Sequence, residues 1–215
     1  MKKIISILGG TFNPIHNGHL LSAKRLLKEI HLQNIFLLPN NIPPHKLTLD
    51  IQNKHRLIMI KLAICSFSKL KMNLLEIKNK NISYTFETLV KIRQKIGTSI
   101  SLIFIIGEDN LYEINRWENW KKFLNFCHIV VIPRKTKLVR KIHDSVLYWI
   151  NTYTIDDISI FHYYSSGFIF FSNIKQENIS SSKIRRYIKI KKEYKQFVPI
   201  KVYHYIKKNN LYLEL

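Results

Sequence analysis

The sequence predicts an α/β fold built on a doubly wound, mostly parallel sheet. Short β-rich runs alternate with segments of helical period along most of the 215 residues. The β-rich runs are apolar without polar alternation, which is typical of parallel strands covered on both faces. Compact polar motifs follow these runs directly, and right-handed crossovers would bring all of the motifs to one edge of the sheet.

The elements are expected in the order strand, helix, strand, helix. The expected strands are KIISIL, IFLLP, MNLLEI, SLIFII, HIVVIP and GFIFFS. The expected helices are residues 20–30, 55–67, 85–96, 117–126, 179–190 and 198–212. In the first helix, the apolar residues at 20, 23, 26, 27 and 30 share one face.

The chain is expected to form a single domain over residues 1–215, with a helical C-terminal part over residues 179–215. No pattern places residues 135–166, which mix aromatic, Lys and His side chains without a period. The length is sufficient for one full hydrophobic core. No repeat or low-complexity linker indicates a second domain.

The charge is unusual, since 35 Lys and Arg against 14 Asp and Glu give a net charge of +21. A basic excess suggests an anionic partner such as nucleic acid or a membrane surface. The basic residues are spread along the whole chain, however, which favours a diffuse positive surface. The apolar runs are too short for a signal sequence or a membrane span, so we expect a cytoplasmic protein. Cys65 and Cys127 lie in apolar runs and are expected to be buried, reduced thiols.

The segment GGTFNPIHNGHL, Gly9 to Leu20, holds three of the six glycines of the chain. Gly9 and Gly10 would let the backbone turn sharply and approach a ligand, and Pro14 would fix the corner. The segment ends where a helix begins, and a helix N-terminus attracts phosphate. His16 and His19 can present two nitrogens to one anion, although a single histidine could instead cap the helix or fill a gap.

A second anion cradle is indicated by ISSSKIRR, Ile179 to Arg186. Read alone, its three serines are candidates for the N-cap of a helix. Combined with the first motif, their hydroxyl and N–H groups and the fixed charge of Arg185 suit a phosphate. The residues of this cradle are Ser180, Ser181, Ser182 and Arg185.

The H-x-G-H turn at His16 to His19 resembles the signature of the nucleotidyltransferase superfamily, which transfers AMP or CMP from a nucleoside triphosphate to a phosphate-bearing acceptor. ISSSKIRR resembles the late I-S-S-T-x-I-R element of the same superfamily. The similarity narrows to the bacterial nicotinate-nucleotide adenylyltransferases through an ordered set of blocks that covers nearly the whole chain outside residues 135–166. These blocks are PNNIPPHK, SYTFETL, FIIGEDNL, Trp117 and IPRK. Asn13 and Ser182 depart from the pattern, because the family usually has Asp at the first position and Thr at the second.

The resemblance implies a Rossmann-like fold and transfer of AMP from ATP to nicotinate mononucleotide, without a covalent enzyme intermediate. It implies that His16, His19 and Arg185 are catalytic, with His19 the first choice for stabilising transition-state charge. The ATP site it implies comprises Gly9, Gly10, Thr11, His16, His19, Gly107, Asp109, Ser180, Ser181, Ser182 and Arg185. The nicotinate-nucleotide site it implies comprises Thr11, Asn41, His45, Lys46, Tyr84, Thr85, Trp117 and Arg134.

Several of these assignments have structural alternatives. Asp109 would accept hydrogen bonds from ribose hydroxyls or form the N-cap of the next helix. Trp117 would stack on the nicotinate ring or belong to ordinary packing. Lys46 and Arg134 would meet phosphate or remain at the surface. No protein metal ligand is expected, because a magnesium ion on ATP is held mainly by phosphate and water.

Two rival functions remain at this point. In the first, the enzyme catalyses the same transfer but the acceptor is nicotinamide mononucleotide or phosphopantetheine. A basic nucleic-acid-binding module would instead explain the net charge, but it requires basic and aromatic residues on a single face. Because the phosphate motifs are local and the charge is diffuse, the enzyme interpretation is favoured, with ATP and nicotinate mononucleotide as substrates.

Overall fold

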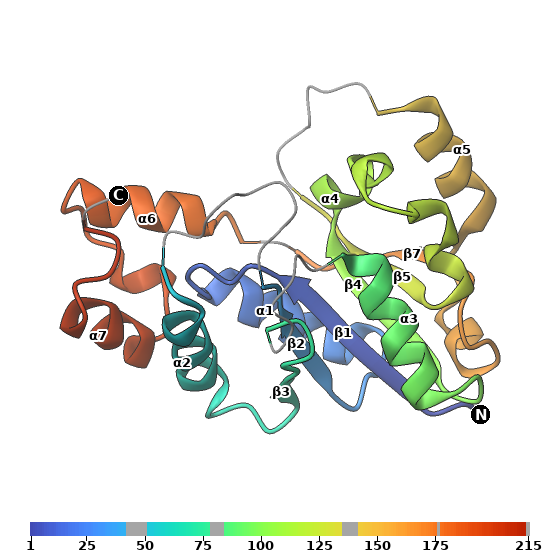
Figure 1. The fold of residues 1–215 in the computed structure, drawn as a ribbon, viewed down its shortest axis with the longest axis horizontal. Coiled ribbons are helices and arrows are strands. Elements are labelled where there is room, and N and C mark those ends of the chain that lie inside the picture. Colours follow the sequence, from blue (N-terminus) through green and yellow to red (C-terminus); the bar gives the residue numbers. More distant parts are fainter. Residues whose placement is uncertain (42–50, 78–83, 135–141, 176, 214–215) are drawn as a thin grey trace.

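The computed structural model describes residues 1–41, 51–77, 84–134, 142–175 and 177–213. Within them, seven strands form one sheet in which every neighbouring pair is parallel, in the order β3-β2-β1-β4-β5-β7-β6 (Figure 1). The strands are β1 (Ile4–Gly10), β2 (Ile35–Pro39), β3 (Leu70–Met72), β4 (Ser101–Gly107), β5 (His128–Ile132), β6 (Thr154–Ile155) and β7 (Ile169–Phe171). The predicted α/β class is confirmed, and the sheet is fully parallel.

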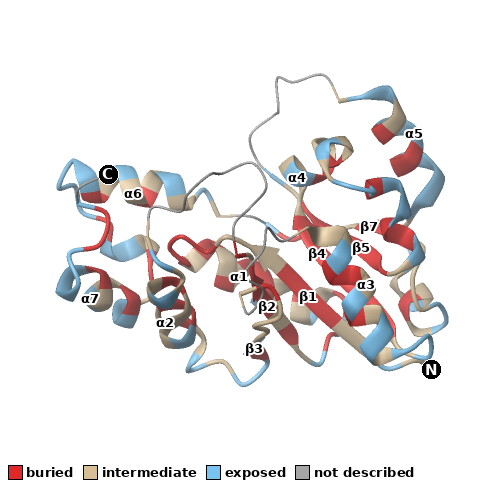
Figure 2. Cartoon of the chain, in the orientation of Figure 1, coloured by how far each residue is buried: buried red, intermediate tan, exposed pale blue. Residues whose placement is uncertain are grey.

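Helices cover both faces of the sheet, as expected for a doubly wound fold. The α-helices are α1 (Asn17–Glu29), α2 (Asn53–Ile64), α3 (Thr85–Ile96), α4 (Glu108–Tyr112), α5 (Asp144–Tyr153), α6 (Ser181–Lys189) and α7 (Ile200–Lys208). Neighbouring strand residues such as Ile7 and Leu8 belong to two separate core clusters. One cluster packs under α1, α2, α6 and α7, and the other packs under α3, α4 and α5. Figure 2 shows the buried residues gathered in the strands and on the inner sides of these helices.

The strand order reverses between β1 and β4. The chain runs outward from β1 to β2 and β3, then returns to place β4 on the other side of β1. This arrangement opens a crevice at the carboxyl ends of β1 and β4, where open parallel sheets bind ligands. The described residues that directly follow β1, β2, β4, β5 and β7 all lie at this edge, because these strands are parallel.

The structure corrects two expected elements and places part of the segment that the sequence left unplaced. The strand expected at MNLLEI, residues 72–77, is wrong: β3 is Leu70–Met72 and shares only Met72 with it, and the residues from 73 to 77 form a loop with a turn. The helix expected over residues 117–126 is a 3-10 helix, Trp120–Asn125, preceded by a second one at Ile114–Arg116. The described part of the unplaced segment forms α5, β6 and a 3-10 helix, Ile158–His162.

The two cysteines differ in environment. Cys127 is buried, as expected, and burial raises the pKa of its thiol. The expectation of a buried Cys65 is wrong, because this residue follows the last residue of α2 and is exposed. Its Sγ accepts a hydrogen bond from Lys201 Nζ at 3.1 Å, which lowers the pKa of the Cys65 thiol.

Among the described residues, no helix combines the length and apolar character needed to cross a bilayer.

Candidate active site

A cavity of about 460 Å³ lies where the strand order reverses. It is lined from β1 by Gly9 and Gly10, from β4 by Phe104 and Ile106, and beyond the strands by Thr11. The other lining residues are Leu38, Asn40, Glu76, Tyr84, Thr85, Asn110, Glu113, Arg116, Trp117 and Glu118. Six sequence-predicted site residues therefore line one cavity. A second cavity of about 370 Å³ between α6 and α7 contains none of them.

Gly9 and Gly10 do not make the sharp turn expected of them. Both lie in β1, and a Cβ on Gly10 would sit 2.9 Å from the ring of Phe12. A Cβ on Gly9 would lie 3.0 Å from the ring of Phe104. The turn itself falls on Phe12, whose φ is 48°. These glycines are therefore required because aromatic rings pack against the end of β1.

His16 and His19 form a stacked pair at the start of α1. Their ring centroids are 3.7 Å apart with an interplanar angle of 21°. His16 is the N-cap of α1: its Nδ1 accepts from the backbone N–H of His19 at 3.4 Å. The Nδ1 of His19 accepts in turn from the backbone N–H of His16 at 3.3 Å. The capping role considered for a histidine is thus confirmed for His16, and the two rings are fixed reciprocally as in a capping box.

The two imidazoles are neutral at physiological pH. Burial lowers the pKa of His16 to about 2, helped by the neighbouring His19 and by the positive charge of Arg134. Burial and Arg134 lower the pKa of His19 to about 3. A neutral ring whose Nδ1 accepts a hydrogen bond carries its proton on Nε2. Each histidine therefore offers one N–H donor, and neither contributes a positive charge.

The second motif lies against the first. The hydroxyl of Ser181 donates to the Pro14 carbonyl at 2.9 Å, and Arg185 Nη1 donates to the Asn13 carbonyl at 2.8 Å. Ser180 is the N-cap of α6 and accepts from the backbone N–H of Lys183, whereas Ser182 is exposed. The N-terminus of α6 and the loop after β1 are thus brought together, although they are more than 160 residues apart in the sequence.

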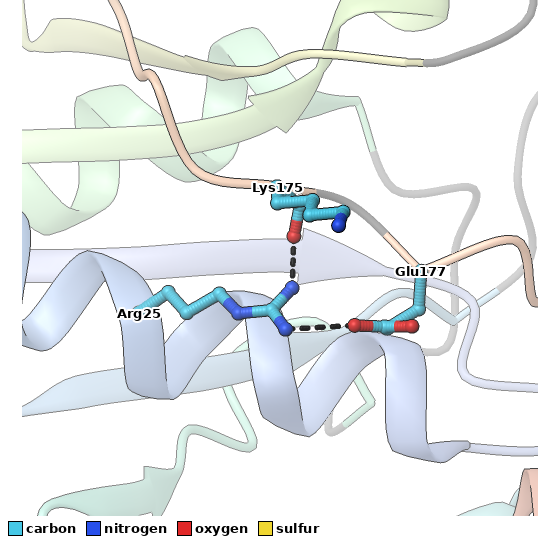
Figure 3. Close-up of polar contacts among 3 residues, drawn as sticks. All are labelled: Arg25, Lys175 and Glu177. Atoms are coloured by element: carbon cyan, nitrogen blue, oxygen red, sulfur yellow. Dashed lines mark hydrogen bonds and ion pairs between the residues drawn. The ribbon is translucent and has the colours of Figure 1, made fainter.

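Helix α1 holds the connection between β7 and α6 in place (Figure 3). Arg25 donates to the backbone carbonyl of Lys175 and forms an ion pair with Glu177 at 2.7 Å. At the end of the same helix, Glu29 accepts from the Ser172 hydroxyl and from the Asn173 N–H at 2.7 Å. These contacts help to hold the start of α6 against the loop that follows β1.

Asn13 is buried at the centre of this junction. Its Oδ1 accepts from the hydroxyl of Tyr212 at 2.6 Å, while its carbonyl accepts from Arg185. Only 2% of its surface is exposed. The neutral amide of Asn13 is therefore part of a hydrogen-bonded core. The contribution of Tyr212 was not predicted, because it lies 199 residues away in the sequence.

Asp109 and Arg134 form an ion pair next to this site. Arg134 Nε lies 3.0 Å from Asp109 Oδ1, and the Arg134 backbone N–H donates to Glu108 at 2.6 Å. The alternative role of Asp109 as an N-cap is wrong, because the N-cap of α4 is Gly107 and Asp109 lies inside the first turn. A Cβ on Gly107 would lie 2.6 Å from Asp109 Oδ1, so a side chain there would displace the carboxylate.

The residues expected to hold the nicotinate are divided by the structure. Tyr84, Thr85 and Trp117 line the cavity, and Tyr84 is the N-cap of α3 without a side-chain cap. Asn41 is buried outside the cavity lining, where its Oδ1 accepts from Asn53 Nδ2 at 2.6 Å. The predicted residues His45 and Lys46 lie outside the described part of the chain.

The two tryptophans have different environments. Trp117 is half-buried and borders the cavity. Trp120 is buried and packs edge-to-face on Trp149, with ring centroids 5.2 Å apart. Packing is therefore the role of Trp120. Trp117 is placed where a ligand ring could stack on it.

Arg56 was missed by the sequence analysis. It is fully buried beneath the loops that follow β1 and β2. Burial lowers the pKa of Arg56 to about 10, so the guanidinium remains charged at neutral pH. One signal was available, because Arg56, Met59, Ile60 and Ala63 follow helical spacing and lie on the buried face of α2.

Among the described residues, no three His, Cys, Asp or Glu side chains gather closely enough to hold a metal ion.

A family model described as cytidylyltransferase-like matches residues 7–187. The chain belongs to this family. A protein of Buchnera aphidicola subsp. Acyrthosiphon pisum (strain 5A), named probable nicotinate-nucleotide adenylyltransferase, is 42% identical over 212 residues, which are 99% of this chain and 98% of the relative. One of the same name from Serratia proteamaculans (strain 568) is 32% identical over 96% of this chain and 94% of its own length. Within the cytidylyltransferase-like proteins, the chain is thus a member of the nicotinate-nucleotide adenylyltransferase family.

A solved structure shares the fold of this cytidylyltransferase-like chain. It is Plasmodium falciparum nicotinic acid mononucleotide adenylyltransferase complexed with NaAD, with a TM-score of 0.72 and 22% identity. The match covers 98% of this chain and 97% of the other. At this identity, the comparison supports the Rossmann-like nucleotidyltransferase architecture of the chain.

Proposed function

We propose that the protein is a nicotinate-nucleotide adenylyltransferase of NAD biosynthesis. It transfers AMP from ATP to nicotinate mononucleotide and releases pyrophosphate. The observation that carries the proposal is the junction of the H-x-G-H loop with the N-terminus of α6, held by Ser181 and Arg185, beside a cavity at the strand reversal. The full-length relatives at up to 42% identity support the choice of substrates.

The reaction joins two phosphorylated substrates, so the protein must position them and offset their charge. The phosphate of the mononucleotide attacks the α-phosphorus of ATP, and the bond to pyrophosphate breaks in line. ATP would bind as its magnesium complex, in which the ion would offset phosphate charge without a protein carboxylate cage. No covalent enzyme intermediate is part of this scheme.

The charges and donors around the loop are divided between two kinds of group. His16 and His19, both neutral, donate through Nε2–H to phosphate oxygens. Arg185 supplies fixed positive charge from α6, and its planar fork suits two oxygens of one phosphate. Neutral N–H donors can act here in place of imidazolium. Negative charge develops on the phosphate oxygens in the transition state, and donors aimed at these oxygens stabilise that charge without a proton transfer.

The cavity is assigned to the acceptor nucleotide. The backbone N–H groups at the uncapped start of α3, next to Tyr84 and Thr85, would meet the nicotinate carboxylate, which the helix N-terminus favours. Trp117 would stack on the pyridine ring. Asp109 would accept from ribose hydroxyls of ATP, with its carboxylate oriented by Arg134. Because these N–H groups favour a carboxylate, the site should prefer nicotinate mononucleotide to nicotinamide mononucleotide.

The test is product formation by the purified protein. Incubation with ATP and nicotinate mononucleotide should give nicotinate adenine dinucleotide and pyrophosphate in equal amounts, without nucleic acid. Parallel reactions with nicotinamide mononucleotide and phosphopantetheine should be much slower. Preference for phosphopantetheine, or no dinucleotide at all, would overturn the proposal.

A variant tests the site within the same assay. His19→Ala should lower turnover by at least about 100-fold, the scale measured for loss of one transition-state donor. Its circular dichroism spectrum should match that of the wild-type protein. Near-normal turnover would remove His19 from the mechanism, while leaving the choice of substrates intact.

A further inference from the structure

Arg56 joins two loops that lie at the edge of the candidate active site. Its Nη1 donates to the Thr11 carbonyl at 2.6 Å, and its Nη2 donates to the Asn40 carbonyl at 2.5 Å. Thr11 follows β1, Asn40 follows β2, and both line the cavity. The guanidinium itself is fully buried on the other side of these residues, since 0% of Arg56 is exposed. Arg56 therefore contacts the cavity wall and not the cavity.

Further hydrogen bonds fix the guanidinium itself. Nη2 also donates to Asn53 Oδ1 at 2.6 Å and to the Asn41 carbonyl at 3.3 Å. Nη1 reaches Asn40 Oδ1 at 3.3 Å. The other end of the Asn40 amide, Nδ2, donates to Thr11 Oγ1 at 3.3 Å. One planar cation thus sets the carbonyl of Thr11, the carbonyl of Asn40 and the rotamer of the Asn40 side chain together.

This arrangement determines which way the loop donors face. In a trans peptide the N–H points away from the C=O. Holding the Thr11 carbonyl on Arg56 therefore turns the Phe12 N–H away from the guanidinium, and holding the Asn40 carbonyl does the same for the Asn41 N–H. The loop after β1 leads directly to the two histidines at the start of α1, so a rotation at Thr11 would propagate toward them.

We propose that Arg56 is a positioning residue for the transfer reaction. It sets Thr11 and Asn40 at the ends of β1 and β2 so that the acceptor nucleotide and the reacting phosphate meet in line. The proposal rests on the adenylyltransferase function proposed above. Misplacement of reacting groups by about 1 Å costs about 100-fold in rate, so small loop shifts should be visible in kcat.

The chain contains a matched control in Arg93 of α3. Its guanidinium also donates to backbone carbonyls, including those of Ile100 and Ser165 at 2.7 Å and Phe126 at 2.6 Å. These carbonyls precede β4, β7 and β5, so they lie at the amino ends of strands, opposite the cavity. Arg93 thus performs the same kind of bridging where no substrate is expected to bind.

The experiment compares Arg56→Lys with Arg93→Lys, using the full chain and urea unfolding to correct for the folded fraction. Lysine keeps the charge but presents its donors from a single nitrogen, so it cannot hold separated carbonyls as the fork does. We expect kcat per folded Arg56→Lys molecule to fall about 10- to 100-fold, with KM for ATP changed less than about threefold. Arg93→Lys should lose stability and keep wild-type kcat and KM per folded molecule.

Chemical rescue provides a second readout. In Arg56→Ala, added ethylguanidinium below denaturing concentrations should restore turnover, whereas ethylammonium should not, because only the planar fork replaces the lost hydrogen bonds. If Arg56→Ala does not fold, the Arg56→Lys comparison decides alone. Equal kinetic constants for Arg56→Lys and wild type, per folded molecule, would overturn the proposal. Failure of the wild-type protein to make the dinucleotide would instead overturn the proposed function.

Discussion

The rings of His16 and His19 stack 3.7 Å apart, and each accepts a hydrogen bond from the other residue's backbone N–H. This reciprocal arrangement uses both Nδ1 atoms within the protein. Each ring is left with Nε2–H as its donor, on a loop whose neighbours include Arg185 and Ser181 through the Asn13 and Pro14 carbonyls. The two histidines therefore fix the start of helix α1 and also present two N–H groups that are candidate donors to phosphate.

The two roles of His16 can be separated by His16→Asn. Asparagine is among the best N-cap residues, and its Oδ1 replaces Nδ1 as the acceptor, but it has no group in place of Nε2–H. The variant should keep its stability within about 0.5 kcal/mol while turnover falls about 100-fold. His16→Ala should lose about 1 kcal/mol as well, because the cap is removed. Urea unfolding and steady-state kinetics of both variants measure this; full turnover in His16→Asn would leave His16 with a capping role alone.

The lowered pKa of His16 predicts acid destabilisation. The unfolded histidine has a pKa near 6.5 and takes up a proton as the pH falls, whereas the folded residue stays neutral down to its pKa of about 2. Its contribution to stability is thus complete above about pH 6.5 and is lost as the pH falls below that value, with a slope of up to about 1.4 kcal/mol per pH unit.

Urea unfolding between pH 7 and pH 4 checks this linkage, with His16→Asn as the reference. The wild-type free energy of unfolding should fall more steeply with decreasing pH than that of the variant. The difference between the two slopes should correspond to the uptake of up to one proton per molecule on unfolding. Identical slopes would mean that His16 titrates normally in the folded protein.

The proposed stacking role of Trp117 predicts an effect on one substrate. Trp117→Ala should raise KM for nicotinate mononucleotide by about 5- to 150-fold, equivalent to about 1–3 kcal/mol of stacking, and change KM for ATP little. Trp120→Phe is the comparison, because Trp120 packs on Trp149 in the core. That variant should lose stability and keep both KM values. An equal rise for both substrates in Trp117→Ala would assign Trp117 to packing.

Arg185→Lys tests whether charge alone is sufficient on α6. Arg185 holds the Asn13 carbonyl, and a planar guanidinium suits two oxygens of one phosphate better than an ammonium does. We expect kcat to fall at least about 10-fold, although the charge is kept. Arg186→Lys is the neighbouring control, since Arg186 is exposed, and it should behave as the wild type. An unaffected Arg185→Lys enzyme would show that the fork is dispensable.

Much of the fold was predictable because apolar runs alternate with segments of helical period, and because β1, β2, β4, β5 and β7 are each followed by a polar motif. Helix 85–96 was predicted with its observed bounds, Thr85–Ile96. The strand expected at MNLLEI was wrong for a local reason. Leu75 packs against the core from a loop, and Glu76 is buried as the acceptor of the Thr88 hydroxyl, so the apolar character of this run reflects coverage of the core rather than strand pairing.

The site was predictable only where its residues are local in sequence. The histidine turn and the serine motif were recognised, whereas the reason for Gly9 depends on Phe104, which lies 3.0 Å from the position of its missing Cβ and belongs to another strand. Arg56 carried a signal in its helical spacing with Met59 and Ile60, but the two loop carbonyls that it joins, those of Thr11 and Asn40, leave no trace in residue identity.

The bond between Tyr212 and Asn13 has a consequence for biosynthesis. The two residues are separated by 199 positions, so a ribosome must make nearly the whole described chain before the tyrosine can reach its acceptor. Closing so large a loop is slow compared with forming the local β1–α1 turn. The local contacts between β1 and α1 can therefore form first, while the buried tyrosine that anchors the intervening turn is added only after residue 212 has been made.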